Sequence, residues 1–108
     1  MSLERDIRDA IVRSLRARGA RPIKFYGCVY SEAGVPDLLI CYRGRFIFLE
    51  TKRPGEKPTP IQCNVMAELR AAGGFGGAVS SVPEALLYLD AVDSEIAYIS
   101  CLESEACA

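Results

Sequence analysis

The chain of 108 residues contains no histidine and no tryptophan. The absence of histidine removes Ser-His and Cys-His catalysis and any metal site built on two imidazoles. None of the five cysteines forms a Cys-x-x-Cys pair, which argues against a zinc finger, and we interpret them as reduced thiols. Any catalyst here must therefore work with carboxylates, lysine, tyrosine and a metal ion.

Long apolar runs are missing too. The longest stretch without a charged residue, 71–83, is too short and too polar to span a bilayer. The first ten residues, MSLERDIRDA, contain no apolar region of a secretory signal. We therefore expect a cytoplasmic protein that is not secreted and has no membrane partner, and the length predicts one domain over residues 1–108.

Charge is unevenly spread, although the net charge is only −1. Residues 1–54 hold 11 Lys and Arg against 6 Asp and Glu, whereas residues 55–108 hold 2 against 8. The basic first half suggests one face that meets a phosphate backbone, while the overall acidity argues against tight non-specific binding of nucleic acid.

Hydrophobic periodicity predicts a mixed α/β domain with the order α-β-β-β-α-β-α around a central sheet. Helices are predicted over residues 3–18, 60–72 and 83–92. Strands are predicted over residues 22–30, 37–42, 45–52 and 75–82. The span Glu95–Leu102 fits a strand or a helix equally well, and residues 103–108 are expected to form a frayed tail.

One predicted strand ends in charged residues. Phe46 to Leu49 are four apolar residues in a row, and Glu50 and Lys52 follow them directly. Residues two apart point to the same face of a strand, so Glu50 and Lys52 share a face. Because buried charges are costly unless they are paired or bind metal, this end of the strand is either solvated or a functional site.

The hairpin before Glu50 adds a second acid. If Arg43-Gly44 is a tight turn, paired positions sum to 87, so that Asp37 lies opposite Glu50 with the Cβ atoms about 4.5–5.5 Å apart. Like charges opposite each other destabilise a sheet, and a divalent cation between them would reverse that effect. Oxygen ligands suit Mg²⁺ or Mn²⁺. The alternative is a solvated strand end in which Lys52 and Arg53 pair with the acids.

Such a site suits phosphodiester hydrolysis. The metal ion would polarise the scissile phosphate and lower the pKa of an attacking water. Lys52 would position or deprotonate that water, or neutralise charge that builds on the phosphate.

Three motifs carry a family resemblance: Gly34 to Ile40 (GVPDLLI), Phe46 to Lys52 (FIFLETK), and Gln62 on the following helix. Together they resemble the PD-(D/E)XK nuclease pattern and, more narrowly, the VRR-NUC (virus-type replication-repair nuclease) domain. The resemblance extends from the first helix to about Val82. It implies a restriction-endonuclease-like αβββαβ core with a central mixed sheet flanked by helices.

The resemblance also implies roles for individual residues. Asp37 and Glu50 would be metal ligands, together with the backbone carbonyl of Thr51. Lys52 would be the catalytic lysine, and Gln62 matches the family glutamine of the catalytic site.

Some of these roles have structural alternatives. Gln62 also stands at the fourth position of a Thr59-Pro-Ile-Gln capping box. Glu4 matches an acidic residue that often reaches the metal, but a first-turn acid is also favoured by the helix dipole. Lys24 and Arg53 are candidates for contact with DNA phosphates.

In function, the resemblance implies a Mg²⁺- or Mn²⁺-dependent endonuclease selective for DNA structure. Stand-alone copies of this size resemble viral and phage proteins, for which a homodimer that resolves Holliday junctions in DNA replication and repair is the implied arrangement. The host cytoplasm would then be its location. The alternative is a non-catalytic nucleic-acid-binding or assembly module that retains the nuclease fold.

Overall fold

The computed structural model describes residues 3–26 and 32–107, with side chains described as far as Ile96. Its elements follow the predicted α-β-β-β-α-β-α order. They are α1 (Leu3–Ala17), β1 (Arg21–Lys24), β2 (Leu38–Tyr42), β3 (Arg45–Thr51), α2 (Pro60–Ala71), β4 (Phe75–Val79) and α3 (Val82–Cys107).

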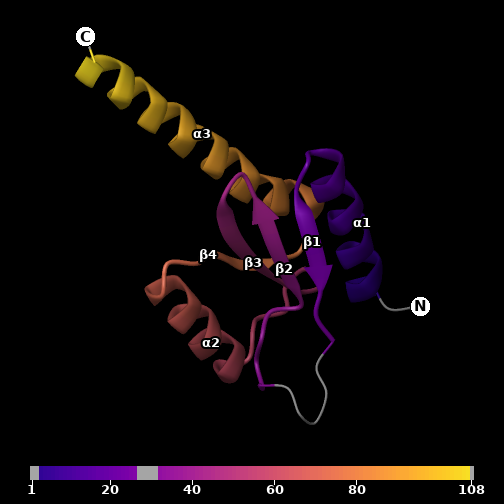
Figure 1. Cartoon of the computed structure of the whole chain (residues 1–108). Coiled ribbons are helices and arrows are strands. Elements are labelled where there is room, and N and C mark those ends of the chain that lie inside the picture. Colours follow the sequence, from indigo (N-terminus) through magenta and orange to yellow (C-terminus); the bar gives the residue numbers. More distant parts are fainter. Residues whose placement is uncertain (1–2, 27–31, 108) are drawn as a thin grey trace.

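The strands form one mixed sheet in the order β1-β2-β3-β4. The first two pairings are antiparallel, and β3 pairs with β4 in parallel, with α2 as the crossover between them. Helices α1 and α3 lie together on one face of the sheet, and α2 lies on the other side (Figure 1). The predicted α/β core with a central mixed sheet flanked by helices is confirmed.

The β2–β3 hairpin has the predicted register. Leu38 pairs with Leu49 and Tyr42 pairs with Arg45, so each pair sums to 87. Arg43 and Gly44 both have positive φ angles, 49° and 81°, as a two-residue turn that follows the right-handed twist of the strands requires. The turn therefore sets which residues meet at the open end of the hairpin.

The main core lies between the sheet and the pair α1 and α3. Its fully buried side chains come from α1, the central strands and α3, and include Ile11, Leu15, Ile47, Leu49 and Leu89. The other face of the sheet has a thinner cover, to which α2 contributes the buried Met66, and the fully buried Phe48 of β3 lies on this face. Since side chains alternate along a strand, Glu50 lies on the same face as Phe48.

Two strands end several residues before their predicted ends. β1 ends at Lys24, whereas the strand was predicted to run to Tyr30, and residues 27–30 of that prediction lie outside the described residues. β4 ends at Val79, because the next N–H group, on Ser80, donates to the Glu84 carboxylate at 2.8 Å instead of continuing the ladder. That contact belongs to the start of α3.

Helix α3 settles the span that the sequence left open. It is one helix of 26 residues from Val82 to Cys107, so Glu95–Leu102 is helical. The helix also includes residues 103–107, for which a frayed tail was expected. Its second half extends beyond the sheet towards the C-terminus (Figure 1). None of the described helices combines the length and apolar character that a bilayer crossing requires.

A polar network attaches α3 to the turn of the hairpin. The carboxylate of Asp93 accepts hydrogen bonds from Tyr42 Oη at 2.9 Å, Arg43 Nη1 at 2.7 Å and Arg18 Nη2 at 3.0 Å. Asp93 thus joins the end of α1, the β2–β3 turn and the middle of α3.

Candidate active site

Two carboxylates meet at the open end of the β2–β3 hairpin. The backbone N–H of Asp37 donates to Glu50 Oε2 at 3.2 Å, and the N–H of Thr51 donates to Asp37 Oδ1 at 2.8 Å. Asp37 directly precedes β2 and Glu50 lies near the end of β3, so the hairpin register alone places them across from each other. The acids are held in place by backbone donors of each other's strand.

Both carboxyl groups are destabilised as anions. Glu50 is only 5% exposed, and burial, reinforced by the negative charge of Asp37, raises its pKa to about 7. Burial also raises the pKa of Asp37, against the lowering effect of the Thr51 N–H group. Two acids that resist ionisation side by side favour a cation between them.

Lys52 lies beside this pair, as the E-x-K spacing predicts. Its Nζ atom is 3.9 Å from Glu50 Oε1 and 3.6 Å from Glu56 Oε1, and the residue is 9% exposed. Glu56 also accepts from Arg53 Nη2 at 2.8 Å. Glu56 was not singled out from the sequence, although its spacing of four residues from Lys52 was a usable signal.

Gln62 completes the predicted capping box and also contacts Glu50. Its Oε1 accepts from the Thr59 N–H at 2.9 Å and its own N–H donates to Thr59 Oγ1 at 3.2 Å, which completes the capping box at the start of α2. Its Nε2 donates to Glu50 Oε1 at 3.1 Å. The cap thus orients the amide that supports Glu50.

The Gly34-Val-Pro segment brings Asp37 against α2. Gly34 has a φ of +81°, and a Cβ atom there would lie 2.5 Å from Ile61 Cγ2 and 2.9 Å from Ile61 O. Only glycine combines this backbone angle with this approach. The segment that leads into Asp37 is therefore packed against the residue next to Gln62.

Two of the predicted site residues lie further out. Glu4, in the first turn of α1, is partly buried, and its negative charge contributes to the raised pKa of Glu50. Lys24 is paired with Asp9 of α1 at 2.8 Å rather than with the central carboxylates. Across the described residues, no group of three or more His, Cys, Asp or Glu side chains converges to hold a metal ion.

Arg8 is the site residue that the sequence did not reveal. Its Nη1 atom is 3.6 Å from Asp37 Oδ2, and its guanidinium lies 5.8 Å from the centre of the Tyr26 ring. It lies one helical turn after Glu4, so both side chains project from the same end of α1. In the sequence, the arginines of this helix form a face that is expected to be solvated. Only the packing of α1 on the sheet brings Arg8 to Asp37.

The oxygen atoms left over at the site fit a hard divalent cation. Asp37 Oδ2 and Thr51 Oγ1 are buried and have no hydrogen-bond partner. The Thr51 carbonyl points to the same side of β3 as its N–H group, which is the side of Asp37. Two carboxylates, a carbonyl and no nitrogen or sulfur donor are a ligand set that suits Mg²⁺ or Mn²⁺.

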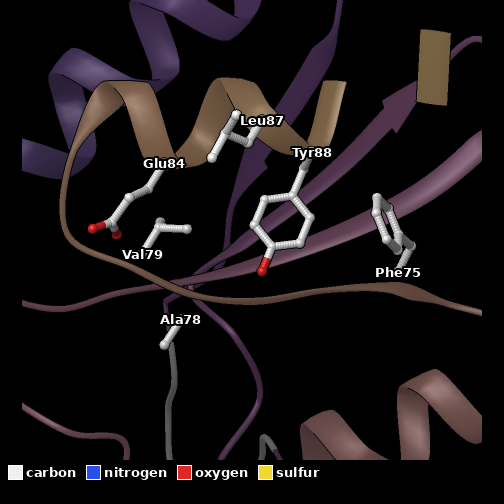
Figure 2. A pocket seen from close by; sticks show the side chains of 6 residues that line it. All are labelled: Phe75, Ala78, Val79, Glu84, Leu87 and Tyr88. Atoms are coloured by element: carbon white, nitrogen blue, oxygen red, sulfur yellow. The ribbon is translucent and has the colours of Figure 1, made fainter. Parts of the chain in front are cut away.

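A separate hollow of about 310 Å³ lies between β4 and α3. Figure 2 shows Tyr88, Leu87 and Glu84 on the α3 side of β4, while Ala78 points to the other side. Its polar groups include Glu84, which is engaged with Ser80 at the start of α3. This hollow opens on the opposite face of the sheet from Glu50, and it has no part in the carboxylate site.

Comparisons with known proteins bear on the family and the fold of the chain. No family model matches the chain. A phage protein described as "Putative nuclease p44", from Acyrthosiphon pisum secondary endosymbiont phage 1, is 41% identical over 71 residues, which cover 65% of this chain and 74% of that protein. A solved structure described as a VRR_NUC domain has a TM-score of 0.70 and 24% identity, and the match covers 83% of this chain and 97% of that one. The chain therefore belongs to the VRR-NUC nuclease family, as its motifs predicted.

Proposed function

We propose that this protein is a DNA endonuclease that hydrolyses phosphodiester bonds with Mg²⁺ or Mn²⁺. The observation that carries the proposal is the buried pair Asp37 and Glu50 with the ammonium of Lys52 3.9 Å from Glu50, on a VRR-NUC fold. A non-catalytic module would have no need of two acids whose proximity destabilises the metal-free protein.

Asp37, Glu50 and the carbonyl of Thr51 would hold the metal ion. When bound, the ion supplies Lewis-acid activation of the scissile phosphate and of the attacking water. Glu4 is a further candidate, since its charge already acts on Glu50.

The other residues orient these ligands. The Thr51 N–H donates a hydrogen bond to Asp37 Oδ1, so that Oδ2 has no hydrogen-bond partner and could bind the metal ion. Gln62 donates to Glu50 Oε1 and so limits its rotation. Lys52 lies close enough to Glu50 to position or deprotonate a water there, or to neutralise charge that develops on the phosphate.

For the substrate, we propose branched DNA, either a Holliday junction or a flap. The support is the family resemblance, together with the basic first half of the chain, which includes the candidate DNA contacts Lys24 and Arg53. Arg53 is largely exposed beside Lys52, although Glu56 pairs with it in the absence of DNA. Replication or repair in the cytoplasm of a phage host is the corresponding setting.

We further propose a homodimer, because two symmetric cuts across a junction require two equivalent sites. On the thinly covered face of the sheet, Ile23 and Phe46 are 54% and 44% exposed and line one apolar hollow. A second copy of the chain could cover these side chains. Light scattering of the wild type and of Phe46→Asp would test this, and a monomeric wild type on DNA would rule out paired incision.

The test of the enzyme is cleavage of labelled four-way junctions, flaps and plain duplex with Mg²⁺ or Mn²⁺, using wild type, Glu50→Ala and Lys52→Ala. Symmetric cuts in the junction by the wild type alone would support the resolvase. Equal cutting of plain duplex would reduce the proposal to a general nuclease. Binding of DNA without any metal-dependent cutting by a folded protein would instead identify a nucleic-acid-binding module.

A further inference from the structure

The central site contains a cation that the proposed mechanism does not use. Arg8 Nη1 lies 3.6 Å from Asp37 Oδ2, and both side chains are largely buried, with 17% and 15% of their surface exposed. Lys52 similarly lies near Glu50. Each acid therefore has one positive side chain beside it, and the four formal charges cancel.

The contact between Arg8 and Asp37 is incomplete. Arg8 Nε and Asp37 Oδ2 are both buried, and neither has a hydrogen-bond partner. A pair that served only to stabilise the fold would be expected to form short, bidentate hydrogen bonds. At 3.6 Å the guanidinium neutralises Asp37 without satisfying the oxygen that a metal ion would need.

The guanidinium also has another partner within reach. It lies 5.8 Å from the centre of the Tyr26 ring, whose face attracts a cation, and Tyr26 is 67% exposed. Loss of the contact with Asp37 would therefore not leave Arg8 without a favourable environment. This makes the Asp37 contact an exchangeable one.

We infer that Arg8 is the resident counter-ion of Asp37 and competes with the divalent metal for Oδ2, so that the DNA-free protein binds metal weakly. The inference rests on the proposed metal site. Displacement of Arg8 by a divalent ion changes a neutral site into one with an excess of positive charge. A DNA phosphate would balance that charge, so the metal and the substrate would bind cooperatively.

The test is calorimetric titration of DNA-free protein with Mn²⁺ alone at pH 8, above the pKa of about 7 of Glu50. We expect Arg8→Gln to bind Mn²⁺ roughly tenfold more tightly than the wild type, because a positive charge next to the ligand is removed. Arg13→Gln removes the same charge from an exposed position of α1 and is expected to change the affinity by less than about twofold. Arg8→Met, which keeps an apolar stem, serves in case Arg8→Gln does not fold.

Melting temperatures give a second readout. Without metal, Arg8→Gln should melt below Arg13→Gln, because Asp37 loses its counter-ion, and Mn²⁺ should raise its melting temperature more than that of the wild type. Equal or weaker Mn²⁺ binding by Arg8→Gln, with measurable wild-type binding, would overturn the role of Arg8 and leave the proposed metal site standing. No Mn²⁺ binding by any folded variant would overturn both proposals.

Discussion

The two ends of the β2–β3 hairpin each contain acidic side chains, but in opposite electrostatic states. At the turn, hydrogen bonds from Arg43 and Tyr42 to Asp93 hold the pKa of that carboxyl below its usual range. At the open end, burial raises the pKa of Asp37 and brings that of Glu50 to about 7. The turn end has three donors for one carboxylate, whereas the open end places two carboxylates together and leaves Asp37 Oδ2 without a donor.

This difference distinguishes a satisfied polar cluster from an unsatisfied one. The donors to Asp93 attach α3 to the turn and leave neither of its carboxylate oxygens without a partner. At the open end, burial and the proximity of the two acids cost stability in the metal-free protein, and the metal ion of the proposed function would remove that cost.

The largest expected effect is on cleavage. Asp37→Asn and Glu50→Gln should each reduce metal-dependent cleavage by roughly 10³-fold or more, since each removes a charged ligand of the ion that activates the phosphate. The Asp93→Asn variant, which changes the turn end of the hairpin, should cut DNA at close to the wild-type rate. The measurement is single-turnover cleavage at saturating Mg²⁺. If Asp93→Asn lost as much cleavage as Asp37→Asn or Glu50→Gln, the two ends of the hairpin would not differ in function.

The next effect concerns pH. In the proposed site, metal binding would need ionised Glu50, whose pKa is raised to about 7 in the metal-free protein. At limiting Mg²⁺ the cleavage rate should therefore fall roughly tenfold for each pH unit below that value. Asp93→Asn should follow the same profile. A rate that stays level between pH 8 and pH 6 at limiting metal would contradict the raised pKa.

Removal of a carboxylate charge should have opposite effects on stability at the two ends of the β2–β3 hairpin. The folded pKa of Glu50 exceeds its ordinary value of 4.5, so ionisation destabilises the metal-free protein as the pH rises from about 4.5 through 7. Glu50→Gln should therefore raise the free energy of unfolding at pH 8, by on the order of 2 kcal/mol, with the gain shrinking towards pH 4.5.

Asp93→Asn should instead lower stability, because the folded pKa of Asp93 is depressed and its contribution is present at every pH above its ordinary value of 3.8. Urea unfolding of both variants at pH 5 and pH 8, without metal, measures the two signs. A destabilised Glu50→Gln at pH 8 would show that the open end is a structural cluster after all.

The smallest effect separates the two roles of Gln62. Thr59→Ala removes the cap of α2 and should cost about 1 kcal/mol of stability with little change in cleavage at a temperature where it is folded. Gln62→Ala also removes the donor to Glu50, so cleavage or metal affinity should fall by roughly tenfold. If folded Thr59→Ala and Gln62→Ala cleave DNA equally well, the role of Gln62 is confined to capping α2.

Much of the fold and of the central site could be predicted from local patterns. The period of two along β3 put Glu50 and Lys52 on one face, and the Arg43-Gly44 turn set the register that brings Asp37 to Glu50. The capping box at Thr59 likewise depends on residues three apart. These features follow from backbone geometry over a few residues, so the sequence by itself determined them.

Other features depend on which distant elements pack together. Arg8 reaches Asp37 only because α1 packs on the sheet, and the raised pKa of Glu50 arises mainly from burial by surrounding elements. The span Glu95–Leu102 stayed ambiguous because its apolar residues fit either period, and the structure makes it part of α3. Burial and long-range charge are properties of the assembled chain, so only the tertiary structure decided how strongly the pKa values of Asp37 and Glu50 are raised.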